Sequence, residues 1–297
     1  MRKTFKLLVA ALSLVFCASL QSCQNTEEVP HGYPILFRCA DITRAEAKLD
    51  DLKENGFDVY AYFTGNGNTF TFTKSLSFDV ANGWIYNGDI EYWLPGATYW
   101  FKAVYPNGVG TIDNTTSVQS FTIENFDVTT QTDLLVAQTG AIDVDASLGS
   151  PTGGSVVNLQ FKHLLANVVV KIKAEVNVTI NDMAIKFVPV NCDYANGFWT
   201  ATSQGNIEKT DINAKLSPGA NPAEIGFLVI PQTVNGEQKL HIKTSDKTYD
   251  IAIPATTWNA GTKYTYTLTI KQNDILFDEP TVEEWDEESA VGSVVIK

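Results

Sequence analysis

The sequence is poor in the residue types that most often build catalytic and metal centres. Its 297 residues include three histidines and four cysteines, and they contain no Cys-x-x-Cys pair, nucleophile elbow, phosphate-binding loop or His-Glu-x-x-His motif. We therefore expect no enzyme, no cofactor and no metal site. The net charge of −13 repels phosphate backbones, which argues against a nucleic-acid partner.

The few candidate polar groups have ordinary structural interpretations. None of His31, His163 and His241 has a metal-ligand partner nearby in the sequence. We expect His163 to be a hydrogen-bonded strand residue, and His241 to point outward between two apolar neighbours. The pair Asp143 and Asp145 lacks the spaced oxygen ligands of a calcium loop, so a solvated turn is the expected structure.

The first 23 residues have the order of a bacterial lipoprotein signal. Basic residues open the chain, an apolar run spans residues 7–20, and Ser22 precedes Cys23. Cleavage there would leave Cys23 to carry acyl chains such as palmitate, which hold a protein to a membrane. The alternative is an ordinary secretory signal in which Cys23 is incidental. Glu27 and Glu28 resemble the acidic signal that sends Bacteroides-type lipoproteins to the outer face of the outer membrane.

Removal of residues 1–22 leaves 18 basic and 34 acidic side chains, a net charge of −16. Only Cys39 and Cys192 then remain for a disulfide. A bridge between them and two buried thiols both stay open, although Cys39 alternates with apolar residues in a way that favours a buried thiol.

Period-two alternation of apolar residues dominates the rest of the chain. In residues 263–270, Tyr264, Tyr266, Leu268 and Ile270 share one face, which predicts a half-buried antiparallel strand. Similar runs occur at residues 57–63, 99–105, 168–176, 185–190, 227–230 and 240–242, separated by Gly, Asn and Pro turns. Many short strands at this spacing predict an all-β protein made of β-sandwiches. Residues 44–55 alone have helical spacing, and Gly56 is placed to end that helix.

Two further features are unusual in distribution. Large aromatic rings gather at Trp84, Tyr86, Tyr92, Trp93, Tyr99 and Trp100, where they favour packing in a sheet and leave a glycan-binding platform as an alternative. Arg38 and Arg44 are the only arginines after residue 22, so an Arg-specific protease could cut only there.

Several segments together resemble the fimbrillin family of Bacteroidales, the lipoprotein precursors of type V pilus subunits of the major or minor fimbrium and of related tip and anchor proteins. The match covers most of the chain. Besides the lipid signal and Trp285, the matching segments are residues 43–45, 57–62, 99–106, 133–137, 161–165, 230–233 and 258–266.

The resemblance implies two tandem transthyretin-like Greek-key β-sandwiches that follow a lipoprotein signal peptide. It also implies that an Arg-specific maturation protease removes an N-terminal strand, so that a strand of another subunit fills the opened groove. Carried onto this sequence, Ile35, Phe37 and Cys39 plug the precursor, Arg44 or Arg38 is cut, and Val291, Val294 and Ile296 belong to the donor strand. A bridge from Cys39 to Cys192 would compete with this maturation, because it would tether the removed segment.

The expected organisation is therefore a signal peptide over residues 1–22, a lipidated leader over 23–44, an N-terminal sandwich over 45–152 and a C-terminal sandwich over 153–297. The last of these would end in the donor strand, residues 289–297. The expected function is a stalk, tip or anchor component of a surface fimbrium that serves cell adhesion. Its expected partners are other fimbrial subunits, the protease, a host or bacterial surface ligand and the outer membrane. The alternative is a surface glycan-binding lipoprotein.

Overall fold

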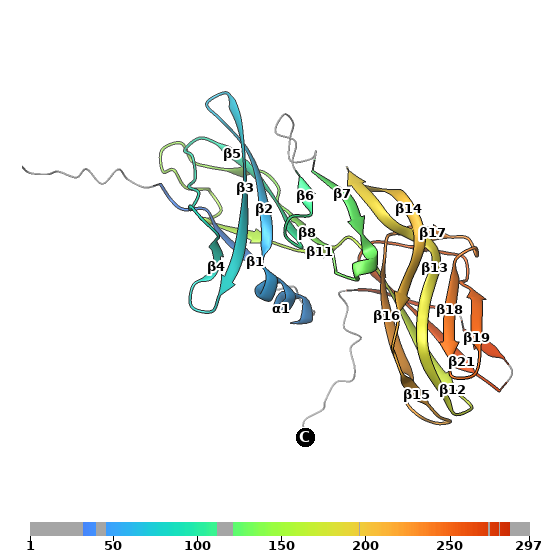
Figure 1. The fold of residues 1–297 in the computed structure, drawn as a ribbon. Helices are drawn as coiled ribbons and strands as arrows, with labels where there is room; N and C mark the ends of the chain where they lie inside the picture. Colours follow the sequence, from blue (N-terminus) through green and yellow to red (C-terminus); the bar gives the residue numbers. More distant parts are fainter. Residues whose placement is uncertain are drawn as a thin grey trace, which may run out of the picture. The chain divides into compact units, whose positions relative to one another are not determined.

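The computed structural model describes residues 32–39, 46–111, 121–195, 197–272, 274–278 and 280–285. Gly32–Lys297 form one compact unit, and strands make up almost all of its regular structure (Figure 1). The predicted all-β class is confirmed. Within the described residues, no helix is both long enough and apolar enough to cross a membrane.

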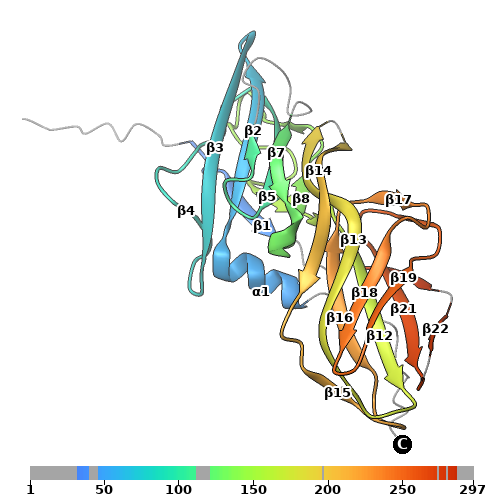
Figure 2. The same cartoon turned by 45° about the vertical axis from the view of Figure 1, so that its right-hand side comes forward.

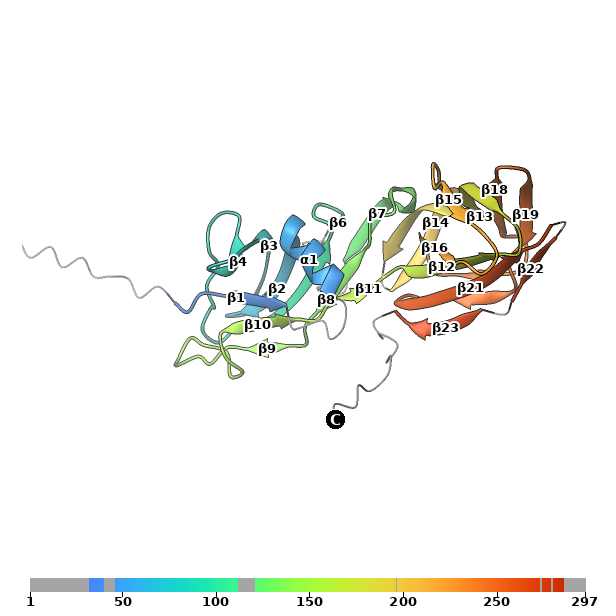
Figure 3. The same ribbon diagram turned by 90° about the horizontal axis from the view of Figure 1, so that it is seen from below.

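The first large sheet has the strand order β11-β8-β5-β2-β3-β4, and β9 also pairs with β5. Its strands are β2 (Phe57–Gly65), β3 (Asn68–Asp79), β4 (Gly83–Tyr86), β5 (Thr98–Tyr105), β8 (Leu135–Gln138), β9 (Ile142–Asp143) and β11 (Lys162–His163). A separate two-stranded sheet joins β1 (Leu36–Cys39) to β10 (Val156–Leu159) in parallel, and Figure 3 shows these strands side by side.

The turn between β2 and β3 and the end of helix α1 lie at the glycines where the sequence predicts them. Asn66 and Gly67 both have positive φ angles, 50° and 76°, which is the geometry of a two-residue hairpin turn between β2 and β3. Helix α1 (Glu46–Asn55) ends at Gly56, whose φ is +74° and whose N–H donates to the Leu52 carbonyl at 2.8 Å. A side chain at Gly56 would meet the carbonyl oxygen of Leu76, so this position requires glycine.

The remaining strands form three more sheets. One has the order β16-β12-β21-β22, with β23 also on β21, and Figure 2 shows β12 beside β16. Another has the order β19-β18-β13-β7-β6, with β14 and β15 also on β13, and the last pairs β17 with β20. The bounds are β6 (Gly110–Thr111), β7 (Thr122–Asp127), η2 (Val128–Thr130), β12 (Ala166–Ala174), β13 (Val178–Ala195), β14 (Phe198–Lys209), β15 (Ala214–Leu216), β16 (Ala223–Val229), β17 (Gln232–Val234), β18 (Lys239–Thr244), β19 (Thr248–Ala252), β20 (Thr256–Trp258), β21 (Thr262–Ile270), β22 (Ile275–Phe277) and β23 (Thr281–Glu284).

Strand β21 corrects one prediction. Its four alternating apolar residues are buried, as the period of two indicates. Its partner β12, however, runs parallel to it, with Val168 opposite Tyr264, while β22 and β23 pair with it antiparallel. Alternation reports which face of a strand is buried and carries no information about the direction of its neighbours, so the antiparallel assignment was wrong for β12.

The sheets interleave along the chain around the expected boundary at residue 153. Strands β10 and β11 lie after it but pair with β1 and β8, whereas β6 and β7 lie before it but belong to the sheet of β13. The division into folding domains at residue 153 stays a prediction. The pairing shows that each side of that position contributes strands to the sheets of the other.

Two separate sets of buried side chains form the cores. The first contains Ile35, Phe37, Phe57, Trp93 and Phe101 among others, and it gathers around the sheet of β2 and β5. The second gathers around β12, β13 and β21, where Trp258 is fully buried and its indole N–H donates to the Tyr266 hydroxyl at 3.1 Å. The first core takes part of its apolar content from Ile35, Phe37 and Cys39, which lie in the predicted leader, residues 23–44; that segment is called the leader below.

Candidate functional site

The leader contributes strand β1 to the first core. Ile35, Phe37 and Cys39 point inward and are 0%, 5% and 8% exposed, whereas Leu36 and Arg38 point outward. This is the face that period two predicts. The three predicted plug residues are therefore core residues.

Backbone hydrogen bonds hold the leader at two successive places. Ahead of β1, Ile35 N–H donates to the Glu91 carbonyl at 2.8 Å, and Trp93 N–H donates to the Tyr33 carbonyl at 3.0 Å. From Leu36 onward the strand pairs with β10 instead, with Leu36 opposite Val156 and Cys39 opposite Leu159. The leader thus changes partners at the start of β1.

Aromatic packing adds to these bonds. The Phe37 ring lies edge-on to Phe101 at 5.4 Å and to Tyr86 at 6.0 Å between ring centroids. The Tyr86 hydroxyl donates to the Ile35 carbonyl at 2.7 Å. Burial raises the pKa of Tyr86 well above its usual range, and Glu91 acts in the same direction, so this hydroxyl keeps its proton and remains a donor.

Sequence reasoning missed the residues that receive the leader. Val157 and Leu159 of β10 are buried while Val156 and Asn158 alternate outward, a short signal that was present in the sequence. No pattern indicated that β10 pairs with a strand about 120 residues earlier in the chain. The backbone hydrogen bonds that Glu91 and Trp93 make to the leader also could not be predicted from the sequence pattern.

Of the two predicted processing sites, Arg38 lies within the described residues and Arg44 does not. Arg38 lies within β1, opposite Asn158, and its Nε donates to the Asn158 side-chain oxygen at 3.0 Å. Its side chain is exposed, but the peptide bond after it belongs to a paired strand. Arg44, Cys23 and the donor residues Val291, Val294 and Ile296 lie outside the described residues, and their roles stay predictions.

Both remaining cysteines are free and buried. Cys39 belongs to the first core and Cys192 to the second, and no bridge joins them. Burial raises the pKa of the Cys39 thiol to about 12, partly opposed by Lys53. Burial likewise raises the pKa of Cys192 to about 11, with Asp193 acting in the same direction.

The burial of the two thiols predicts how fast each reacts with a maleimide. At pH 8 both groups are neutral and enclosed, so a maleimide should label neither Cys39 nor Cys192 within minutes, as read by peptide mass mapping. Once the leader strand has left the core, Cys39 should label at least about tenfold faster while Cys192 stays protected. Cys192 is the internal control, and rapid labelling of Cys39 in the uncut chain would contradict the buried leader.

The aromatic cluster is mainly a packing feature. Trp93 and Tyr99 are buried, and their rings meet at 4.9 Å in an edge-on pair. Trp84 is half-buried against Phe57 at 4.7 Å. Tyr92 is exposed. Most of the rings that a glycan platform would need are therefore committed to the sheet and its core.

His163 and Asp145 lie as predicted, whereas Asp143 belongs to strand β9 and accepts from the Thr98 hydroxyl at 2.7 Å. His163 is buried in β11, where its Nδ1 lies 2.8 Å from a carboxylate oxygen of Asp133 and its ring stacks on Trp285 at 3.7 Å. Asp145 accepts hydrogen bonds from Ser147 and Leu148 within its own turn, and these bonds lower its pKa. Among the described residues, no group of three or more His, Cys, Asp or Glu side chains could hold a metal ion.

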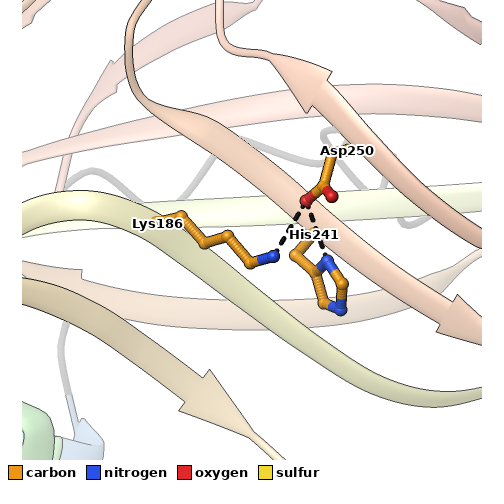
Figure 4. A network of polar contacts seen from close by, with 3 residues as sticks. All are labelled: Lys186, His241 and Asp250. Carbon is orange, nitrogen blue, oxygen red and sulfur yellow. Dashed lines mark hydrogen bonds and ion pairs between the residues drawn. The ribbon is translucent and has the colours of Figure 1, made fainter.

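Figure 4 shows the other titratable cluster. The Asp250 carboxylate of β19 meets His241 Nδ1 of β18 at 2.8 Å and Lys186 Nζ of β13 at 3.0 Å. The contact with His241, followed by that with Lys186, lowers the pKa of Asp250. His241 lies between buried Leu240 and Ile242 as predicted, and the network links three neighbouring strands.

The fold and this site define an all-β protein in which residues 35–39, ahead of helix α1, supply a core strand. A family model described as fimbrillin-like matches residues 43–285, and the chain belongs to that family. The resemblance noted from the sequence is thereby confirmed.

Solved structures agree on the fold. A fimbrial protein from Bacteroides vulgatus is similar with a TM-score of 0.62 and 19% identity, over 85% of this chain and 99% of that one. A candidate cell adhesion protein from Bacteroides ovatus is similar with a TM-score of 0.54 and 13% identity, over 79% of this chain and 89% of that one. A comparison with curated protein sequences gives no match.

Proposed function

We propose that this chain is a component of a surface fimbrium, as stalk, tip or anchor, and that it assembles by β-strand exchange and serves cell adhesion. Membership of the fimbrillin-like family and the likeness to a fimbrial protein and a cell adhesion protein of known structure support this role. The observation that carries the exchange is the leader strand: a segment ahead of the first helix supplies three core side chains and is held by hydrogen bonds and packing. Such a strand can be replaced by another of similar pattern.

Arg44 is the cut that releases the whole strand. Hydrolysis of the peptide bond between Arg44 and Ala45 adds water and leaves a carboxylate and an amine, so that all of β1 lies on the departing side. A cut after Arg38 would leave Cys39 attached to the rest of the chain. The Arg38 bond also lies in a strand paired with β10, which a protease could reach only after that pairing opens.

The incoming strand would come from the C-terminal segment of the next subunit. Loss of β1 exposes the inner face around Phe101 and the unpaired edge of β10, which is a site for strand addition. Val291, Val294 and Ile296 are apolar and β-prone, and we assign them to refill the emptied core. Acyl chains on Cys23 would hold the precursor at the outer membrane until the leader is cut.

The experiment treats the full chain with an Arg-specific protease and compares wild type with Arg38→Ala and Arg44→Ala. We expect trimming by intact mass and an SDS-resistant ladder in wild type and in Arg38→Ala, which keeps Arg44. Arg44→Ala should give neither the residue-44 product nor the ladder. A ladder of normal strength from Arg44→Ala would refute the assignment, and trimming without any ladder would refute the exchange.

A further inference from the structure

The leader strand leaves one of its edges open. The N–H and C=O groups of one residue point to the same edge of a strand, and those of the next residue point to the other edge. Leu36 N–H donates toward β10, to the Ser155 carbonyl at 3.4 Å, so the N–H and C=O groups of Phe37 and Cys39 point away from β10. Among the described residues, no strand pairs with that edge of β1.

A second open edge lies beside it. In the part of the chain that the structure describes, strand β4 ends its sheet and has β3 as its one partner. Strands β1 and β4 are in contact (Figure 1). Residues of both strands, together with Lys53 of α1 and Phe78 of β3, line a groove of about 480 Å³, which we call the slot. The bond from the Tyr86 hydroxyl to the Ile35 carbonyl joins β4 to the residue just ahead of β1.

The slot has the chemistry to receive an extended chain. Two unpaired strand edges offer N–H and C=O groups, as in recognition by strand addition. Trp84 and Phe78 supply apolar surface, and their rings meet at 5.1 Å. Arg38 and Lys53 supply positive charge, with Lys53 Nζ 5.4 Å from the centre of the Phe78 ring.

We propose that this slot is where the C-terminal segment of a second copy first docks, before the leader strand leaves. Residues 286–288 are Asp, Glu and Glu, and the β-prone run 289–297 follows them. Acids followed by apolar residues complement the two cations and the rings of the slot. The whole chain is strongly acidic and has only two arginines after residue 22, so a lysine and an arginine beside an open strand edge are a specific feature. This inference rests on the proposed function.

Docking beside β1 gives the exchange a physical route. Departure of the leader alone would expose Phe101, Trp93 and their neighbours in the first core to water, which is unfavourable for apolar surface. A strand already paired in the slot can enter residue by residue as the leader leaves. The unfavourable empty state then never forms.

The test uses the full chain before any cut and a synthetic peptide of residues 286–297. We expect the peptide to slow amide hydrogen exchange at Phe37 and Cys39, whereas the amides of Leu36 and Arg38, which face β10, change little. Lys53→Glu should weaken peptide binding, measured by fluorescence anisotropy, by about fivefold or more. Lys173→Glu makes the same charge change at an exposed site on β12 and should have no effect.

Two results would contradict docking at the slot. One is unchanged amide hydrogen exchange at Phe37 and Cys39 when the peptide is added, and the other is an equal effect of Lys53→Glu and Lys173→Glu on peptide binding. If a ladder forms after the cut but the peptide does not bind to the uncut chain, docking at the slot is contradicted and the proposed strand exchange is not. If the peptide binds but no ladder forms, the proposed fimbrial assembly is contradicted instead. Protection that is present without peptide and is lost on deletion of residues 286–297 would assign the slot to the chain's own C-terminus.

Discussion

Phe37→Ala should lower the free energy of unfolding by about 3 to 5 kcal/mol, the usual cost of removing a buried phenylalanine. The ring is 5% exposed and packs against Phe101 and Tyr86, so its loss leaves a cavity that these neighbours cannot close without moving. Leu36→Ala, one residue earlier in the same strand, is the matched control. Leu36 is 41% exposed, and its truncation should cost about 0.5 kcal/mol.

The same substitution should speed the release of the leader. If about 3 kcal/mol of leader binding is lost, dissociation after the cut becomes about 100-fold faster, since each 1.4 kcal/mol is a factor of ten. Urea unfolding measures the first effect, and the time course of leader loss by intact mass measures the second. Phe37→Leu, a milder truncation, covers the case in which the alanine variant does not fold. Equal behaviour of Phe37→Ala and Leu36→Ala would show that β1 does not plug the core.

The sequence predicted the inward face of the leader correctly because period two is a local property. Ile35, Phe37 and Cys39 alternate with outward residues, and any partner that covers one face of the strand buries the same three side chains. The end of α1 at Gly56 and the hairpin turn at Asn66 and Gly67 were predictable for the same reason, because backbone conformations with positive φ favour few residue types.

The partners of each strand were not predictable. Pairing of Leu36 with Val156, and of Val168 with Tyr264, depends on contacts between residues far apart in the chain. The parallel direction of these pairs does not change the local alternation of apolar residues. The backbone hydrogen bonds of Glu91 and Trp93 to the leader do not change it either. The slot between β1 and β4 was hidden for the same reason, since it exists only where two unpaired edges meet.

The contacts of His163 were predictable only in part. The sequence suggested a hydrogen-bonded strand histidine, and the contact with Asp133 agrees with that. Its stacking on Trp285 joins a strand of the first sheet to a residue more than 120 positions later. Trp285 is the last described residue before the proposed donor segment, and its N–H donates to the Gly261 carbonyl at 2.9 Å.

Covalent locking of the leader should abolish assembly while leaving the cut intact. Leu36 and Val156 are register partners with outward side chains, and neighbouring strands bring Cα atoms within the range of a disulfide. The variant Leu36→Cys/Val156→Cys keeps both arginines. Lys171→Cys/Glu224→Cys is the matched control, because it places a comparable exposed bridge between β12 and β16, away from the leader.

The most direct measurement of the central claim is SDS-resistant laddering of the locked variant after treatment with the Arg-specific protease, with and without reductant. Under oxidising conditions, intact mass should show the cut chain with its leader still attached and no ladder should form. Reduction should release the leader and restore the ladder, and the control pair should ladder in both conditions. A normal ladder from the oxidised, verified lock would contradict exchange of β1 for a strand of another copy.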